Sequence, residues 1–165
     1  LTRTDEAKKV SDNSVEIASL VQTSDYLALS KRSNSEFVAG KKAIQKAYEE
    51  ANITVDDLDF AEVHDCFTIA ELLAYEALGL AEDGKGGEIL GEGIVEVGGK
   101  TPVNASGGLK AKGHPVGATG VSMAVLAARQ LKGEAIGHQI EGAKTGITFN
   151  IGGSAASNYA LVFKK

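Results

Sequence analysis

The chain has 165 residues, 43% of them hydrophobic, which is enough to bury one core, so we predict a single domain over residues 1–165. The net charge of -5 and the absence of a dense Lys or Arg run argue against nucleic acid or an anionic membrane surface as a partner. One cysteine excludes an internal disulfide, and the sequence shows neither a membrane-spanning apolar run nor a signal-peptide pattern, so we expect a cytoplasmic protein. Because the chain opens without Met in a charged, helix-like segment at 5–9, we expect a fragment or a processed chain.

The first half of the chain predicts two strands and two helices. Residues 14–21 alternate polar and apolar side chains and predict a strand, and residues 58–63 predict a shorter one. Between them, apolar positions recur at helical spacing and predict an amphipathic helix that ends near Asn52. Its candidate N-caps are Ser33, Asn34 and Ser35. Residues 67–80 are apolar on nearly every face and close on Gly79, which predicts a buried helix.

Glycine dominates the following segment, because twelve of the twenty glycines and both prolines lie between residues 84 and 120. Glycine permits positive φ and proline fixes φ. The pattern therefore predicts a long shaped loop rather than a helix or a strand, with a β-hairpin near residues 93–99.

The last part of the chain predicts one helix and two strands. A mostly apolar helix over 121–131 is stopped at Gly133. Strands at 145–150 and 156–163 are joined by a short link, which favours an antiparallel pair. The whole order is βαβαβαββ, an α/β fold in which helices flank a mixed five-stranded sheet and the earlier strands, separated by helices, run parallel.

Three junctions between predicted elements carry unusual chemistry: His64-Asp65-Cys66, Gly113-His114-Pro115 and Asn150-Ile151-Gly152-Gly153. Ligands gather where strands end and helices begin in sheets of this class. His114 is held between Gly and Pro, which is typical of a catalytic base or an oxyanion donor at a helix start. The alternative is a tight turn with an incidental histidine.

Cys66 and the glycine pair each allow two interpretations. A thiol at a helix N-terminus beside a histidine should ionise more readily, which makes Cys66 a candidate acid/base or nucleophile. A buried structural cysteine is the alternative. The N–H groups of Gly152 and Gly153 form an anion-binding nest in one interpretation and a plain hairpin turn in the other.

Other motifs are excluded. The sequence contains no P-loop and no complete dinucleotide-binding glycine fingerprint. No metal site is predicted, because His64, Asp65 and Cys66 are consecutive and no second ligand pair has zinc spacing. His138 lies in a polar stretch and is interpreted as a solvated surface histidine.

Taken together, the three junctions resemble the C-terminal half of a thiolase. The resemblance rests on His64-Asp65-Cys66-Phe67, on the Gly-rich segment 107–120 around His114, and on Asn150-Ile151-Gly152-Gly153, in this order along the chain. The combination is most similar to the archaeal and sterol-carrier-protein-associated branch of the family.

The resemblance implies a role for each motif residue. His114 matches the histidine that activates the nucleophilic cysteine and polarises the thioester oxygen. His64 stands where most thiolases carry an Asn that holds an oxyanion-hole water, and Cys66 matches the second acid/base of this branch. Gly152 lends its N–H to the second oxyanion hole. Substrate-binding positions are Gly113, Ser106, Gly107 and Asn150.

The resemblance also implies substrates and partners. Coenzyme A thioesters are the expected substrates, without a cofactor, in an acetyl-CoA C-acetyltransferase reaction. An N-terminal half, in cis or in trans, carries the nucleophilic cysteine, so the isolated chain should be inactive. A homo-oligomer and a zinc-ribbon/OB-fold protein are further expected partners. The alternatives are a non-catalytic scaffold or lipid-carrier-associated module, and a thiol hydrolase built on Cys66 and His114.

Overall fold

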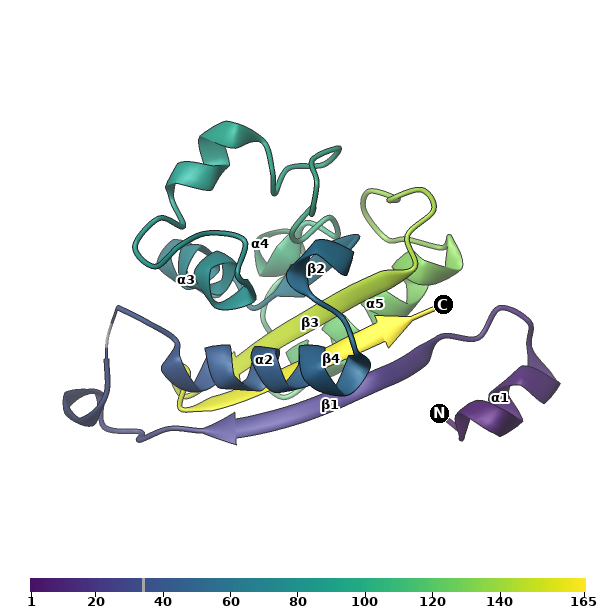
Figure 1. Cartoon of the computed structure of the whole chain (residues 1–165), viewed down its shortest axis with the longest axis horizontal. Helices are drawn as coiled ribbons and strands as arrows, with labels where there is room; N and C mark the ends of the chain where they lie inside the picture. Colours follow the sequence, from purple (N-terminus) through teal and green to yellow (C-terminus); the bar gives the residue numbers. More distant parts are fainter. Residues whose placement is uncertain (34) are drawn as a thin grey trace.

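The computed structural model describes residues 1–33 and 35–165, so the predicted N-cap Asn34 lies outside the described residues. The described residues form one mixed sheet with helices on both faces (Figure 1). The strands are β1 Glu16–Ser24, β2 Phe60–Val63, β3 Thr145–Gly152 and β4 Ser157–Lys164. The α-helices are α1 Thr4–Val10, α2 Val38–Ala51, α3 Thr68–Leu78, α4 Gly108–Lys112 and α5 Thr119–Lys132.

The sheet has the strand order β1-β4-β3-β2. β2 pairs with β3 in parallel, whereas β4 pairs antiparallel with both β3 and β1. β1, β2 and β3 therefore run in one direction, as predicted for strands separated by helices. β1 and β2 are nonetheless not neighbours, because the β3–β4 pair lies between them.

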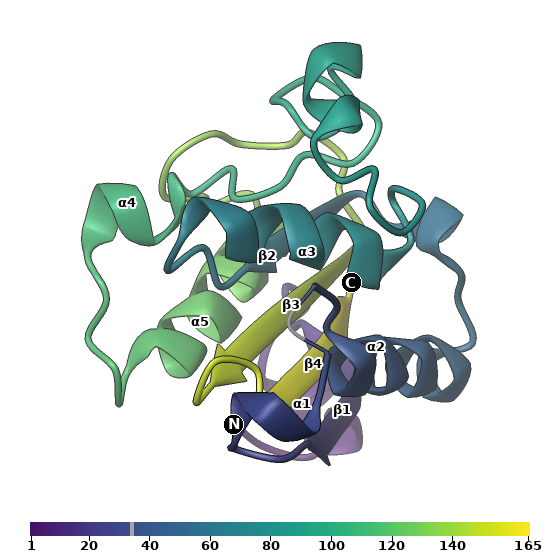
Figure 2. The ribbon, with the colours of Figure 1, turned by 90° about the vertical axis from the view of Figure 1, so that its left-hand side faces the viewer.

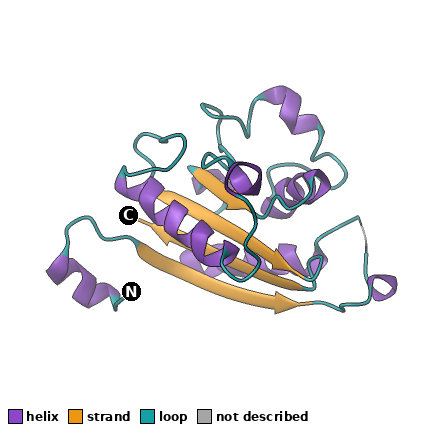
Figure 3. Cartoon of the chain, turned by 180° about the vertical axis from the view of Figure 1, so that it is seen from behind, coloured by secondary structure: helices purple, strands orange, loops and turns teal. Residues whose placement is uncertain are grey.

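Three layers make up the fold. α2 and α3 cover one face of the sheet, where small side chains such as Ala43, Ala47 and Ala74 let the helices approach the strands closely (Figures 1 and 2). α5 covers the other face, where Ala127 and Leu131 pack with side chains of β2 and β4 (Figure 3). Burial from both sides explains why four consecutive residues of β3 and all of β2 are buried.

The predicted helix ends are confirmed. α2, α3 and α5 are followed by Asn52, Gly79 and Gly133, and each of these three adopts a left-handed conformation that ends its helix. None of the helices in the described part of the chain is long and apolar enough to cross a membrane.

The prediction of five strands was wrong, because the described sheet has four. Residues 93–99 do not form a hairpin: Gly93 and Gly98 have positive φ and the chain folds back in turns. Just after this segment, Val103 forms an isolated parallel bridge with Ala61 of β2. A further difference is α4, a short helix within the segment predicted to be a loop.

Candidate active site

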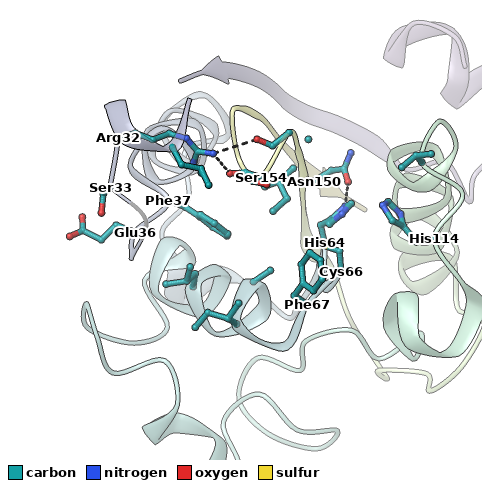
Figure 4. A pocket seen from close by; sticks show the side chains of 18 residues that line it. Arg32, Ser33, Glu36, Phe37, His64, Cys66, Phe67, His114, Asn150 and Ser154 are labelled. Atoms are coloured by element: carbon teal, nitrogen blue, oxygen red, sulfur yellow. Dashed lines mark hydrogen bonds between the residues drawn. The ribbon is translucent and has the colours of Figure 1, made fainter. Parts of the chain in front are cut away.

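One cavity of about 570 Å³ opens where the parallel strands β2 and β3 end (Figure 4). His64 and Cys66 come directly after β2, and Asn150 and Gly152 are among the last residues of β3. The loop before α5 adds His114. The other walls are mostly apolar and include Phe37, Phe67, Ile69, Leu73 and Ile151. The structure thus places all three predicted junctions around one space.

His64 is a buried imidazole with a defined hydrogen-bond partner. The residue is 6% exposed, and its Nδ1 lies 2.6 Å from the Oδ1 of Asn150 on the neighbouring strand. Because an amide oxygen only accepts, Nδ1 carries the proton and Nε2 keeps its lone pair. Burial lowers the pKa of His64, and the opposing effect of the Asn150 bond is smaller. We therefore treat His64 as neutral at pH 7.

His114 is exposed, but its ring, like that of His64, is held in place through Nδ1. Its Nδ1 lies 2.7 Å from the hydroxyl oxygen of Thr119, and that hydroxyl donates to the carbonyl of Pro115 at 3.2 Å. The hydroxyl has one proton, so it accepts from Nδ1–H and leaves Nε2 of His114 free as a base. The His114 ring meets that of His64 edge to face, with 4.7 Å between the centroids (Figure 4). α5 begins only at Thr119, so His114 precedes the helix start instead of occupying it.

Cys66 is a partly buried thiol at the start of α3, and the prediction that it ionises readily was wrong. Burial raises the pKa of Cys66 and outweighs the bonds from the backbone N–H groups of Phe67 and Cys66, which lower it, while the neighbouring Asp65 charge adds a smaller increase. The imidazole that was expected to favour the thiolate is that of His64, which is itself kept neutral by burial. Cys66 therefore rests as a thiol, a form that donates a proton.

Comparison with known proteins identifies the family. A family model described as "Thiolase C-terminal domain-like" matches residues 21–165. The chain is a thiolase C-terminal domain. It is 41% identical over 162 residues to an acetyl-CoA acetyltransferase of Methanothermobacter thermautotrophicus, a match that covers 98% of this chain and 42% of that enzyme.

One further relative of this thiolase domain and one solved structure of similar fold carry other names. Sterol carrier protein 2 of Homo sapiens is 46% identical over 116 residues, which are 70% of this chain and 21% of that protein. The solved structure of an Ltp2-ChsH2(DUF35) aldolase superposes with a TM-score of 0.78 at 23% identity, over 91% of this chain and 39% of that one, and shows a shared fold. The thiolase domain thus spans less than half the length of the two relatives and of the solved structure.

Three of the predicted substrate-binding residues of the thiolase domain lie outside the cavity lining: Ser106, Gly107 and Gly113. The hydroxyl of Ser106 donates to the buried Glu62 carboxylate at 2.6 Å, so its side chain is engaged with the protein. Gly107 precedes α4 and Gly113 follows it, directly before His114. A substrate-binding role for these three residues stays a prediction.

Sequence reasoning missed two residues that orient the candidate site residues of the thiolase domain. Thr119 holds His114, and its position five residues later, at the first turn of a helix, was the available signal. Gly120 makes room for Asn150, because a Cβ at this position would lie 2.9 Å from the amide nitrogen of Asn150. No sequence signal links residues 120 and 150, which only the packing of α5 on β3 brings together.

Proposed function

We propose that this thiolase domain provides the acid/base half of an active site that forms or cleaves 3-oxoacyl-CoA thioesters, by Claisen condensation or thiolysis. One arrangement carries the proposal: two imidazoles, 4.7 Å apart, and one thiol line the same cavity. Each imidazole is fixed through Nδ1 and offers Nε2 to a reacting group. Coenzyme A thioesters are the proposed substrates, and the reaction needs no additional cofactor.

The chemistry of condensation assigns a different task to each group. An acyl group first moves from a thioester to a cysteine nucleophile; His114 takes the proton of that cysteine and returns it to the departing coenzyme A sulfur. A second acyl-CoA then loses a proton from Cα, and its enolate attacks the acyl-enzyme carbonyl as the cysteine thiolate leaves. Nε2 of His64 holds a water that donates to the enolate oxygen.

Cys66 is the proposed proton carrier at Cα. In the cleavage direction the enolate of the departing acyl-CoA needs a proton, and a resting thiol supplies it. The raised pKa of Cys66 supports this role, because burial keeps the proton on sulfur until the carbon base is present. In condensation the Cys66 thiol first passes its proton to His114, and the resulting thiolate takes the proton from Cα. His114 then returns its proton to the cysteine thiolate that leaves the acyl group.

The nucleophile is proposed to come from a different segment, in cis or in trans, because Cys66 is the one cysteine of these 165 residues. Phe67, Ile69 and Val116 at the cavity are 71%, 58% and 84% exposed, and this apolar surface is available for such a segment to cover. A homo-oligomer and a DUF35-type partner, the latter suggested by the structurally similar Ltp2-ChsH2(DUF35) aldolase, are further proposals.

Reconstitution tests the proposal. We expect the chain alone to leave acetoacetyl-CoA uncleaved, and to cleave it once a thiolase N-terminal half that carries the nucleophilic cysteine is added. In the reconstituted enzyme, His114→Ala should slow acyl-enzyme formation by about 10²- to 10⁴-fold, the usual cost of losing a general base. Cys66→Ala should still trap labelled acetyl-enzyme and fail in condensation. His138→Ala, an exposed histidine outside the cavity, is the matched control.

Two outcomes would support other functions. If both variants acylate and turn over like the parent, the domain is a non-catalytic scaffold, an interpretation that the similarity to sterol carrier protein 2 also supports. Turnover by the lone chain that is abolished by Cys66→Ser would instead indicate a thiol hydrolase. The raised pKa of Cys66 argues against that hydrolase, because a nucleophilic cysteine needs an accessible thiolate.

A further inference from the structure

The short helix α4 begins without a cap from its N-cap residue. That residue, Gly107, has no side chain, and no side-chain cap bond is present at this position. The free N–H groups of a helix's first turn need acceptors when they are partly buried. Here the acceptor comes from a distant segment: the N–H of Leu109 donates to Oδ1 of Asp65 at 2.8 Å.

Asp65 lies between two proposed catalytic residues, His64 and Cys66. Its carboxylate packs so closely on α4 that a Cβ at Gly108 would be 2.2 Å from Oδ2. Gly108 also has a φ of +61°, which few other residues adopt. The turn after β2 and the start of α4 are therefore in direct contact through one carboxylate, at a position where only glycine fits.

Leu109 connects Asp65 with the residue that precedes His114. Its N–H binds Asp65, and its carbonyl accepts the N–H of Gly113 at 2.7 Å. Leu109 is 7% exposed, so both of its peptide groups are held inside the protein. Gly113 ends α4 and is followed at once by His114. A chain of two hydrogen bonds thus connects Asp65 with the residue before the proposed base.

A second attachment to α4 starts from β2 itself. The buried carboxylate of Glu62 accepts the Ser106 hydroxyl at 2.6 Å and the Ser106 N–H at 3.2 Å. From there Ser106 contacts both ends of α4: its hydroxyl oxygen accepts from Nζ of Lys112 at 2.9 Å and from the Gly108 N–H at 3.4 Å, and Nζ of Lys112 lies 3.8 Å from the Glu62 carboxylate. The 2.8 Å bond of Asp65 is therefore the shorter side-chain contact with the first turn of α4.

We infer that Asp65 is a positioning residue: its carboxylate caps α4 and thereby sets where His114 stands relative to His64 and Cys66. The geometric part of this inference stands on the contacts alone. Its catalytic part rests on the proposed function, since His114 matters to turnover only if it is the base. Asp65 touches no reacting atom in this scheme and acts through Leu109 and Gly113.

Histidine side-chain NMR on the full chain tests the geometric part without any activity. Asp65→Ala should shift the ring resonances of His114 and leave those of His138, which is exposed and outside the cavity, unchanged. Asp65→Asn removes the charge but keeps an oxygen for the Leu109 N–H, so it should restore the His114 resonances. Asp57→Ala is the matched control, because Asp57 accepts the Thr54 N–H at 2.8 Å in another short helix.

Amide hydrogen exchange provides a measurement that needs no variant. In the unmodified chain, the amides of Leu109 and Gly113 should be protected to a similar degree, because the two bonds open together. An unprotected Leu109 amide would overturn the inference even if Asp65→Ala failed to fold. So would an Asp65→Asn variant whose His114 resonances match those of Asp65→Ala, because the effect would then be one of charge.

Kinetics in the reconstituted enzyme test the catalytic part. Asp65→Ala should lower kcat roughly tenfold with little change in KM, because a displaced base weakens the transition state more than substrate binding. Asp65→Asn should recover most of the lost rate. An unchanged kcat in Asp65→Ala together with shifted His114 resonances would contradict the catalytic part only. Absence of activity in the unmodified reconstituted enzyme would contradict the proposed function and leave the NMR result standing.

Discussion

The two imidazoles of the site are oriented in the same way by different parts of the fold. His64 follows the buried strand β2 and is held across the sheet by Asn150 of β3. His114 lies in an exposed loop and is held by Thr119, the first residue of the helix α5 that follows this loop. Strand pairing provides a rigid position and lowers the pKa of His64 by burial, whereas local bonds leave the His114 ring accessible to a partner segment. His64 thus has the more rigid position, and His114 has the more accessible ring.

The largest effect on this comparison is expected from Thr119→Val, which keeps the shape of the side chain and removes the acceptor for Nδ1–H of His114. Thr119 is 1% exposed, so water cannot readily replace the hydroxyl. A hydrogen bond of about 1 kcal/mol corresponds to roughly a five- to tenfold loss of kcat in the reconstituted enzyme. Thr119→Ser keeps the hydroxyl and should retain most of the rate. Equal rates in both variants would show that the hydroxyl does not orient His114.

A smaller effect is expected on the His64 side from Gly120→Ala. The new methyl would lie 2.9 Å from the Asn150 amide nitrogen, so the amide must rotate away and its bond to His64 weakens. Activity should fall a few-fold, while helix propensity raises the free energy of unfolding by roughly 0.5–1 kcal/mol. Gly117→Ala is the control, since a Cβ there meets nothing within 4 Å. The measurements are kcat and denaturant unfolding. A Gly120→Ala variant with full activity would show that the Asn150 bond to His64 does not contribute to turnover.

The smallest effect is a pH dependence of stability that arises from His64. The pKa of His64 is lowered in the folded chain, so the unfolded chain binds more protons as the pH falls below about 6.5. Its contribution is complete above that pH and is lost as the pH falls toward the lowered pKa, by at most about 1.4 kcal/mol per pH unit. Asp65 and His114 are the charged neighbours that act on it.

Denaturant unfolding between pH 7.5 and 5 measures this effect as a difference between variants. His64→Asn should flatten the decline of stability at acid pH, and His138→Asn should leave it unchanged. Comparing each variant with the parent removes the contribution of Glu62, whose pKa is raised by burial and which titrates in the opposite sense. Parallel curves for the parent and His64→Asn would show that the His64 ring is not desolvated in solution.

The sequence alone determined the regular part of the fold and the identity of the motif residues. Helical periodicity and positive-φ residues located α2, α3 and α5 with their ends at Asn52, Gly79 and Gly133, because these signals are local. The same local signals predicted that His64, Cys66, His114 and Asn150 lie near the ends of helices or strands. That they line one cavity follows from parallel pairing of β2 and β3, which alternation and helical crossovers already favoured.

Only the tertiary structure decided the glycine-rich segment and the charge states of the site. Residues 93–103 meet the sheet through one bridge instead of forming a fifth strand, and the first turn of α4 donates an N–H to Asp65, more than forty positions earlier. Neither contact leaves a periodic signal in the sequence. The thiol form of Cys66 and the neutral form of His64 likewise depend on burial, a property of the surrounding packing that a motif does not encode.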